Sequence, residues 1–165
     1  MTMTYFADLS TYAYSRFGTD DTLNIGWLDA AHPFPTGSVE TDAVDALWQY
    51  CKVSVAQTRG LHQCELCPPG PGRRYPQAER NGEKLLLGTS EIRVFGEGEK
   101  IFAAPTLVYH YVVAHDYVPP RIFIDALIAT PAPPAIEYFD RLRRHGIEWR
   151  QTSAPDPNPF GTPSG

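Results

Sequence analysis

Residues 91–103, EIRVFGEGEKIFA, form the stretch that decides the fold predicted for this chain. Ile92 and Val94 alternate with polar or charged side chains, and a second apolar segment begins at Ile101. Between the two segments, residues 96–99 read GEGE and provide two glycines for a turn. Two apolar segments on either side of a short glycine-containing connection predict an antiparallel β-hairpin.

Further short strands and four helices are predicted around this hairpin. Residues 23–27 alternate with a period of two, and residues 85–87 can supply a third strand beside the hairpin. Apolar residues recur with helical spacing in four segments, at residues 41–52, 105–116, 120–129 and 136–144. The predicted fold class is therefore α+β, a small antiparallel sheet packed with three to four helices.

Each predicted helix has end signals and one apolar face. Thr41 is placed to cap the first helix, Pro105 to begin the second, and Gly146 to follow the end of the last. The residues expected to point inward are Val44, Leu47, Trp48 and Cys51 in the first helix, Leu107, Val108, Tyr111 and Val112 in the second, Ile122, Phe123, Ala126 and Leu127 in the third, and Ile136, Phe139 and Leu142 in the last.

The composition is that of an acidic, loop-rich protein. Its 165 residues suit a single hydrophobic core, and its 16 prolines and 13 glycines exceed the usual share. We expect one globular domain over residues 1–151 and a disordered tail over residues 152–165. The net charge of −5 argues against nucleic-acid binding driven by overall charge. Because no membrane-spanning apolar segment or secretory signal is evident, we expect a cytoplasmic protein.

The three cysteines fall into two different environments. An odd, small number without a secretory signal does not describe a disulfide framework. Cys51 lies on the apolar face of the helix predicted at residues 41–52, which indicates a buried small hydrophobic residue. Cys64 and Cys67 form a Cys-x-x-Cys pair inside a long irregular stretch, residues 57–83. A loop of this length in a small domain needs support beyond a core, and a metal ion could provide it.

His110 and His115 are the best candidates to complete a four-ligand metal site with Cys64 and Cys67. Their His-x4-His spacing falls within the usual range for a Cys2His2 zinc site. On an ideal helix these two positions diverge by about 140°, so convergence requires the helix to loosen near His115. His62 is the alternative histidine ligand. The result would be a zinc knuckle, a hairpin and a helix around one ion, in an arrangement similar to treble-clef zinc domains.

Other interpretations of these residues stay open. The two histidines could be ordinary helix residues beside idle thiols, or Cys64 and Cys67 could be a redox-active pair. A catalytic zinc would need an open position and a general base, for which Glu65 and Glu91 are the nearest candidates in sequence. The His-Glu-x-x-His and zinc-deaminase signatures are both absent. Two thiolates and two imidazoles therefore favour a closed, structural zinc site.

Several segments resemble an uncharacterised domain family that we associate with actinobacteria. The resemblance extends over residues 5–130 and implies a shared fold without an assigned activity. The stretches that carry it are LNIGWL at residues 23–28, HPFPTG at 32–37, TRGLH at 58–62 with Cys64 and Cys67, EIRV at 91–94, and Ala104 and Pro105 with His110, His115, Tyr117, Pro119 and Pro120.

Two functions are compatible with this pattern. The first is a zinc-stabilised, non-catalytic interaction protein, such as an adaptor or an immunity-type binding protein, whose partner is another protein. The second is a metal-dependent hydrolase or nuclease with an open zinc site and Glu65 or Glu91 as base. The acidic charge, the closed ligand set and the lack of a fixed general base favour the first. The acidic charge also argues against a nucleic acid as partner, and the lack of a membrane-spanning apolar segment argues against a membrane.

Overall fold

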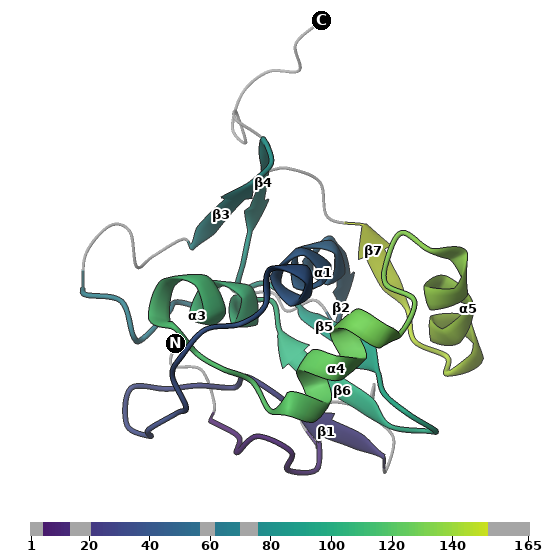
Figure 1. The fold of residues 1–165 in the computed structure, drawn as a ribbon, viewed down its shortest axis with the longest axis horizontal. Helices are drawn as coiled ribbons and strands as arrows, with labels where there is room; N and C mark the ends of the chain where they lie inside the picture. Colours follow the sequence, from purple (N-terminus) through teal and green to yellow (C-terminus); the bar gives the residue numbers. More distant parts are fainter. Residues whose placement is uncertain (1–4, 14–20, 57–61, 70–75, 152–165) are drawn as a thin grey trace, which may run out of the picture.

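A five-stranded mixed sheet lies at the centre of the structure, a computed structural model that describes residues 5–13, 21–56, 62–69 and 76–151 (Figure 1). Its strand order is β1-β6-β5-β2-β7, and the β1–β6 pair is parallel while the others are antiparallel. The strands are β1 (Thr22–Asn24), β2 (Val53–Val55), β5 (Glu91–Phe95), β6 (Ile101–Pro105) and β7 (Trp149–Gln151). The α+β class is thus confirmed, with a mixed rather than fully antiparallel sheet.

The predicted hairpin forms the two central strands. β5 and β6 pair in the register from Phe95–Ile101 to Glu91–Pro105, and every residue of both strands is buried. Pro105 ends β6 and does not begin a helix, which corrects the expectation from its position before an apolar segment. The strand can end there because proline cannot donate a further backbone hydrogen bond to the sheet.

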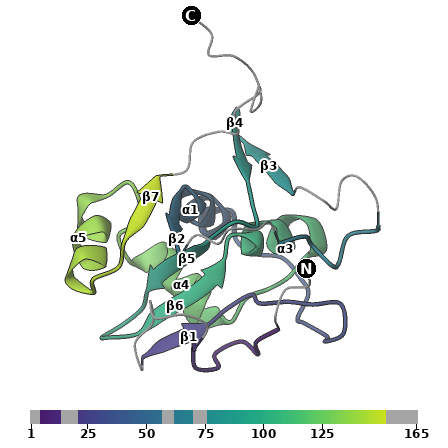
Figure 2. The ribbon, with the colours of Figure 1, turned by 180° about the vertical axis from the view of Figure 1, so that it is seen from behind.

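Three helices cover one face of the sheet, and a fourth lies at its β7 end (Figures 1 and 2). The helix α1 contacts α3, α4 and β5, so it lies at the middle of the helical layer. All four helices occur within two residues of their predicted bounds. They are α1 (Thr41–Cys51), α3 (Leu107–His115), α4 (Arg121–Ala129) and α5 (Ile136–Arg144). Glu40 stands at the N-cap of α1 without a side-chain cap bond, so the expectation that Thr41 caps this helix is wrong.

Two isoleucines expected to be buried are exposed. Ile122 in α4 is 41% exposed and Ile136 in α5 is 67% exposed, whereas Ile124 and Tyr138 take the inner positions. In α5 the Tyr138 hydroxyl donates a 2.7 Å hydrogen bond to the Arg93 carbonyl of β5. A buried tyrosine needs such a partner, and this bond selects the face of α5 that packs inward.

The long stretch expected to be irregular contains a second hairpin. β3 (Gln77–Arg80) and β4 (Glu83–Leu86) pair only with each other, so Leu85 does not extend the central sheet. Asn81 and Gly82 connect them with positive φ angles of 52° and 80°. An Asn-Gly pair favours this turn geometry, and it was the sequence signal for the hairpin. Residues 57–61 and 70–75 of that stretch, and the predicted tail at 152–165, lie outside the described residues.

No helix within the described ranges has the length and apolar character needed to span a bilayer. The predicted extent of the domain, residues 1–151, stays a prediction.

Candidate metal centre

The Cys-x-x-Cys segment forms a tight turn whose backbone supports its first cysteine. Cys64 is fully buried, and the backbone N–H groups of Leu66 and Cys67 donate hydrogen bonds to its sulfur. This arrangement follows from the two-residue spacing, because the chain must turn back on itself for both sulfur atoms to point to one side. The turn thus presents two thiol groups to the same point.

A short chain of hydrogen bonds holds this turn against the start of α3. The His62 N–H donates to the Gly88 carbonyl at 2.8 Å, and the Gly88 N–H donates to the Thr106 hydroxyl at 2.9 Å. Gly88 has a φ of +98°, and a Cβ atom there would overlap the His62 carbonyl oxygen. Only glycine permits this close approach, so Gly88 sets the position of the cysteine turn relative to α3.

Helix α3 supplies the two histidines. His110 lies within the helix and His115 is its last residue, followed by Asp116 in the left-handed conformation with a φ of 58°. The Tyr117 N–H donates back to the Tyr111 carbonyl at 3.1 Å and closes the helix end. The two imidazole rings come to 5.0 Å between centroids. The α3 helix therefore ends at His115, the position where the His-x4-His spacing required the backbone to depart from an ideal helix.

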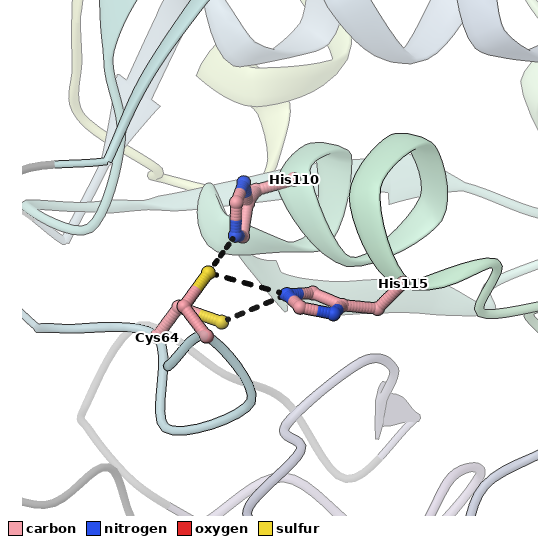
Figure 3. A group of neighbouring side chains, drawn as sticks. Cys64, His110 and His115 are labelled. Atoms are coloured by element: carbon pink, nitrogen blue, oxygen red, sulfur yellow. Dashed lines mark hydrogen bonds between the residues drawn. The ribbon is translucent and has the colours of Figure 1, made fainter. Parts of the chain in front are cut away.

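The four side chains meet at one point (Figure 3). The Cys67 sulfur lies 3.2 Å from His110 Nε2 and 3.4 Å from His115 Nε2, and the Cys64 sulfur lies 3.4 Å from His115 Nε2. One ligand atom from each of these four residues lies within 4.8 Å of the other three. The structure thus brings together all four predicted ligands, from segments more than 40 residues apart, in a group that could hold a metal ion.

Burial favours the uncharged forms of Cys64, His110 and His115. It raises the pKa of the Cys64 thiol to about 11, despite the opposing backbone hydrogen bonds. It also lowers the pKa values of His110 and His115, and each imidazole therefore favours its neutral form. A neutral imidazole keeps a lone pair available for a metal, whereas the thiol must release its proton when a metal binds.

Residues 4–128 of the chain match a protein family described as a domain of unknown function (DUF7919). The chain belongs to this family. The match includes Cys64, Cys67, His110 and His115, and it ends within α4, before α5 and β7. No curated protein and no solved structure matches the chain. Membership of an uncharacterised family is therefore confirmed, and its actinobacterial lineage stays a prediction.

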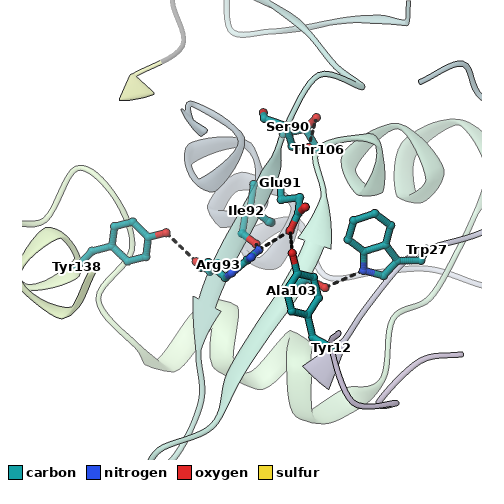
Figure 4. Close-up of polar contacts among 9 residues, drawn as sticks. All are labelled: Tyr12, Trp27, Ser90, Glu91, Ile92, Arg93, Ala103, Thr106 and Tyr138. Carbon is teal, nitrogen blue, oxygen red and sulfur yellow. Dashed lines mark hydrogen bonds and ion pairs between the residues drawn. The ribbon is translucent and has the colours of Figure 1, made fainter. Parts of the chain in front are cut away.

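Two other candidate residues of this DUF7919 domain lie elsewhere. His62 is absent from the four-residue group, and its contribution to the site is the backbone bond to Gly88. Glu91 is buried in the sheet, where its carboxylate accepts hydrogen bonds from Tyr12 and Arg93 at 2.8 Å (Figure 4). Burial raises the pKa of Glu91 more than the Arg93 guanidinium lowers it. Glu91 is therefore part of the core and is held by its own network.

Glu65 lies closer to the group. Burial raises the pKa of Tyr111, and the charges of Cys64 and Glu65 raise it further, so both side chains lie within electrostatic range of this ring.

Sequence reasoning did not find the supporting positions Gly88 and Thr106. The available signal was a single glycine between an apolar run and a strand, which often marks a close approach of two backbones.

Cys51 is a buried core residue, as its place on the apolar face predicted. It is 2% exposed, and burial raises the pKa of its thiol to about 12. Its sulfur lies 3.8 Å from the Thr106 carbonyl oxygen, its hydrogen-bond acceptor.

Cys51→Ser is expected to lower the free energy of unfolding by about 1–3 kcal/mol. The shorter C–O bond moves the hydroxyl away from the Thr106 carbonyl and leaves a buried polar group without a good partner. Urea unfolding followed by tryptophan fluorescence measures the loss. Cys51→Ala is the matched control, because it removes the sulfur without adding a hydroxyl, and a serine variant as stable as wild type would contradict the burial argument.

Proposed function

We propose that Cys64, Cys67, His110 and His115 bind one zinc ion as a structural site, and that the protein is a zinc-stabilised, non-catalytic interaction protein. The observation that carries this proposal is the meeting of two thiol sulfurs and two imidazole nitrogens within 4.8 Å. The cellular role would be that of an adaptor or an immunity-type binding protein, with another protein as partner.

The donor set supports zinc over other cations. Calcium and magnesium select oxygen ligands, whereas two thiolates and two imidazoles form a typical tetrahedral zinc site. With Zn–S of about 2.3 Å and Zn–N of about 2.0–2.1 Å, a tetrahedral ion holds sulfur and nitrogen ligands about 3.5 Å apart. The sulfur–nitrogen distances of 3.2–3.4 Å in this group need to expand only slightly to meet that geometry.

The number of ligands supports a structural role over a catalytic one. Four protein ligands fill a tetrahedral zinc, and a catalytic zinc keeps one position for water. The ion would join the turn at Cys64 and Cys67 to α3, which supplies both histidines. A domain with a net charge of −5 and a closed metal site is suited to binding a basic surface of a partner protein.

A metal-dependent hydrolase or nuclease is the second candidate, and the position of Glu65 favours it. Glu65 directly follows Cys64, and its charge raises the pKa of Tyr111, so this carboxylate is close enough to the ligands to be a candidate base beside the ion. This function requires one histidine to leave the metal and water to take its place. His115, at the end of α3, is the ligand most easily released.

The protein is expected to purify with about one zinc per chain. Native mass spectrometry with elemental analysis measures the ratio. Cys67→Ser should lose the metal, because it replaces a thiolate ligand, while Cys51→Ser should keep it. Protein that contains no metal yet keeps its fold with all thiols reduced would refute the site.

Cobalt substitution separates the two candidate functions. Co²⁺ in a closed four-ligand site gives a tetrahedral visible spectrum that added azide leaves unchanged. An open site takes up azide, and the spectrum shifts towards five-coordinate cobalt. An unchanged spectrum supports the structural role, whereas a shift on addition of azide would favour the hydrolase.

A further inference from the structure

A second site lies at the α5 end of the molecule, away from α3 and its histidines (Figure 1). A cavity of about 320 Å³ opens between the β5–β6 turn and the C-terminal end of α5. The side chains that line it are Phe95, Glu99, Lys100, Arg141, Arg144 and His145. The family match ends at residue 128, so the α5 wall of this cavity lies outside it.

The cavity concentrates positive charge on an acidic protein. Lys100, Arg141 and Arg144 supply three permanent positive charges against the single carboxylate of Glu99. Within the described ranges, none of these three cations forms an ion pair with a carboxylate. Arg143, in the same turn of α5, instead pairs with Asp140 at 3.0 Å. Within α5, the arginines without a carboxylate partner are therefore Arg141 and Arg144, the two that line the cavity.

The end of α5 does not account for this charge. Basic residues often complement the C-terminal carbonyl groups of a helix, and the sequence alone favours that role for Arg141 and Arg144. In the structure three of those carbonyl groups already have partners, because the carbonyls of residues 141, 142 and 143 accept bonds from the N–H groups of His145, Ile147 and Gly146. Lys100 comes from the β5–β6 turn, so it is not part of the helix end at all.

The floor of the cavity holds two of these side chains in place. Phe95 is buried, the Arg141 guanidinium lies over its ring at 5.6 Å, and the His145 ring stacks on it at 5.5 Å. Side chains that are already packed lose little conformational entropy when a ligand binds. Arg141 is thus preorganised at the base, while Lys100 and Arg144 are exposed at the rim.

We propose that this cavity binds a small, soluble phosphate ester. A phosphate group matches the planar donor pattern of arginine and the point charge of lysine, and one dianion would balance the local charge excess. The volume lies at the lower end of the range for small-molecule sites, about 300–1,000 Å³, and leaves room for the ester group beside the phosphate. The proposal is independent of the metal centre, because the two sites share no residue.

The test is a titration of the ¹⁵N-labelled full chain, followed by NMR, at constant ionic strength. The probes are inorganic phosphate and glucose 6-phosphate, with uncharged glucose as the control ligand. Saturable shifts are expected for both phosphates at the amides of Gly98, Lys100, Arg144 and His145, and none for glucose. Lys100→Gln and Arg144→Gln, both exposed and compatible with folding, should each weaken binding at least about tenfold.

Arg143→Gln is the matched control, since it removes the same charge from the same helix turn outside the cavity. It should change the dissociation constant less than about twofold. Equal weakening by Arg143→Gln and Arg144→Gln would mean general charge attraction and would overturn the proposal. Shifts that chloride reproduces would also overturn it. Binding to vesicles that contain phosphatidic acid, without any response to the soluble phosphates, would assign the surface to lipid and reject a soluble ligand.

Discussion

Cys67→Ala and His115→Ala are each expected to raise hydrogen exchange in two segments at once, residues 62–69 and the last turn of α3. The two positions are 48 residues apart, but their side chains meet at 3.4 Å in the candidate metal centre. In a structural site the free energy of metal binding is also free energy of folding. Removal of either ligand therefore removes support from both segments, and exchange measured by mass spectrometry should increase by more than about tenfold in each.

Chelator treatment of the wild-type protein should reproduce the same pattern. His32→Ala is the control, because His32 lies on an exposed loop, pairs with Asp29 and is not part of the group. Exchange that rises only around the substituted residue in each variant would contradict a shared ion. It would leave Cys64 and Cys67 as a separate thiol pair.

Glu91→Ala is expected to reduce the free energy of unfolding by about 3–5 kcal/mol. The Arg93 guanidinium is fully buried, and the Glu91 carboxylate 2.8 Å away is its ion-pair partner (Figure 4). Loss of Glu91 leaves a buried positive charge without compensation, and it also removes the acceptor for the Tyr12 hydroxyl. Urea unfolding followed by tryptophan fluorescence measures the effect.

Glu97→Ala is the matched control, because Glu97 is exposed in the turn of the same hairpin, and its loss should change stability by less than about 0.5 kcal/mol. The double variant Glu91→Ala/Arg93→Ala should lose less than the sum of the single variants, since removing both partners leaves no unpaired charge. A loss below about 1 kcal/mol for Glu91→Ala would show that water reaches Arg93 and that this part of the core is open.

Sequence patterns determined the elements but not always the faces that they bury. The hairpin at β5–β6 and the four helices follow from periodicity and turn residues, which act over a few neighbouring positions. Ile122 and Ile136 were misplaced because both helices carry apolar residues on more than one side. Their orientation depends on what they pack against, as the bond from Tyr138 to the Arg93 carbonyl shows.

The candidate ligands could be selected from the sequence by chemistry and spacing. The two cysteines are three positions apart and the two histidines are five apart. These residue types and spacings suit the binding of one metal ion, and the structure brings the four residues together. The sequence left His62 as an alternative, because the linear distance from His62 to Cys64 is far shorter than that from His110. Spacing along the chain contains no information on which distant segment folds back.

Only the tertiary structure decided which histidines join the two cysteines, through contacts between segments that are far apart in the chain. The Thr106 hydroxyl and the Gly88 backbone fix the cysteine turn against α3, so that His110 and His115 face the sulfur atoms while His62 serves through its backbone. The parallel pairing of β1 with β6 and the addition of β7 have the same origin. Each depends on close packing between residues whose local sequence patterns are independent of one another, whereas hairpins and helices depend on neighbours within a few residues.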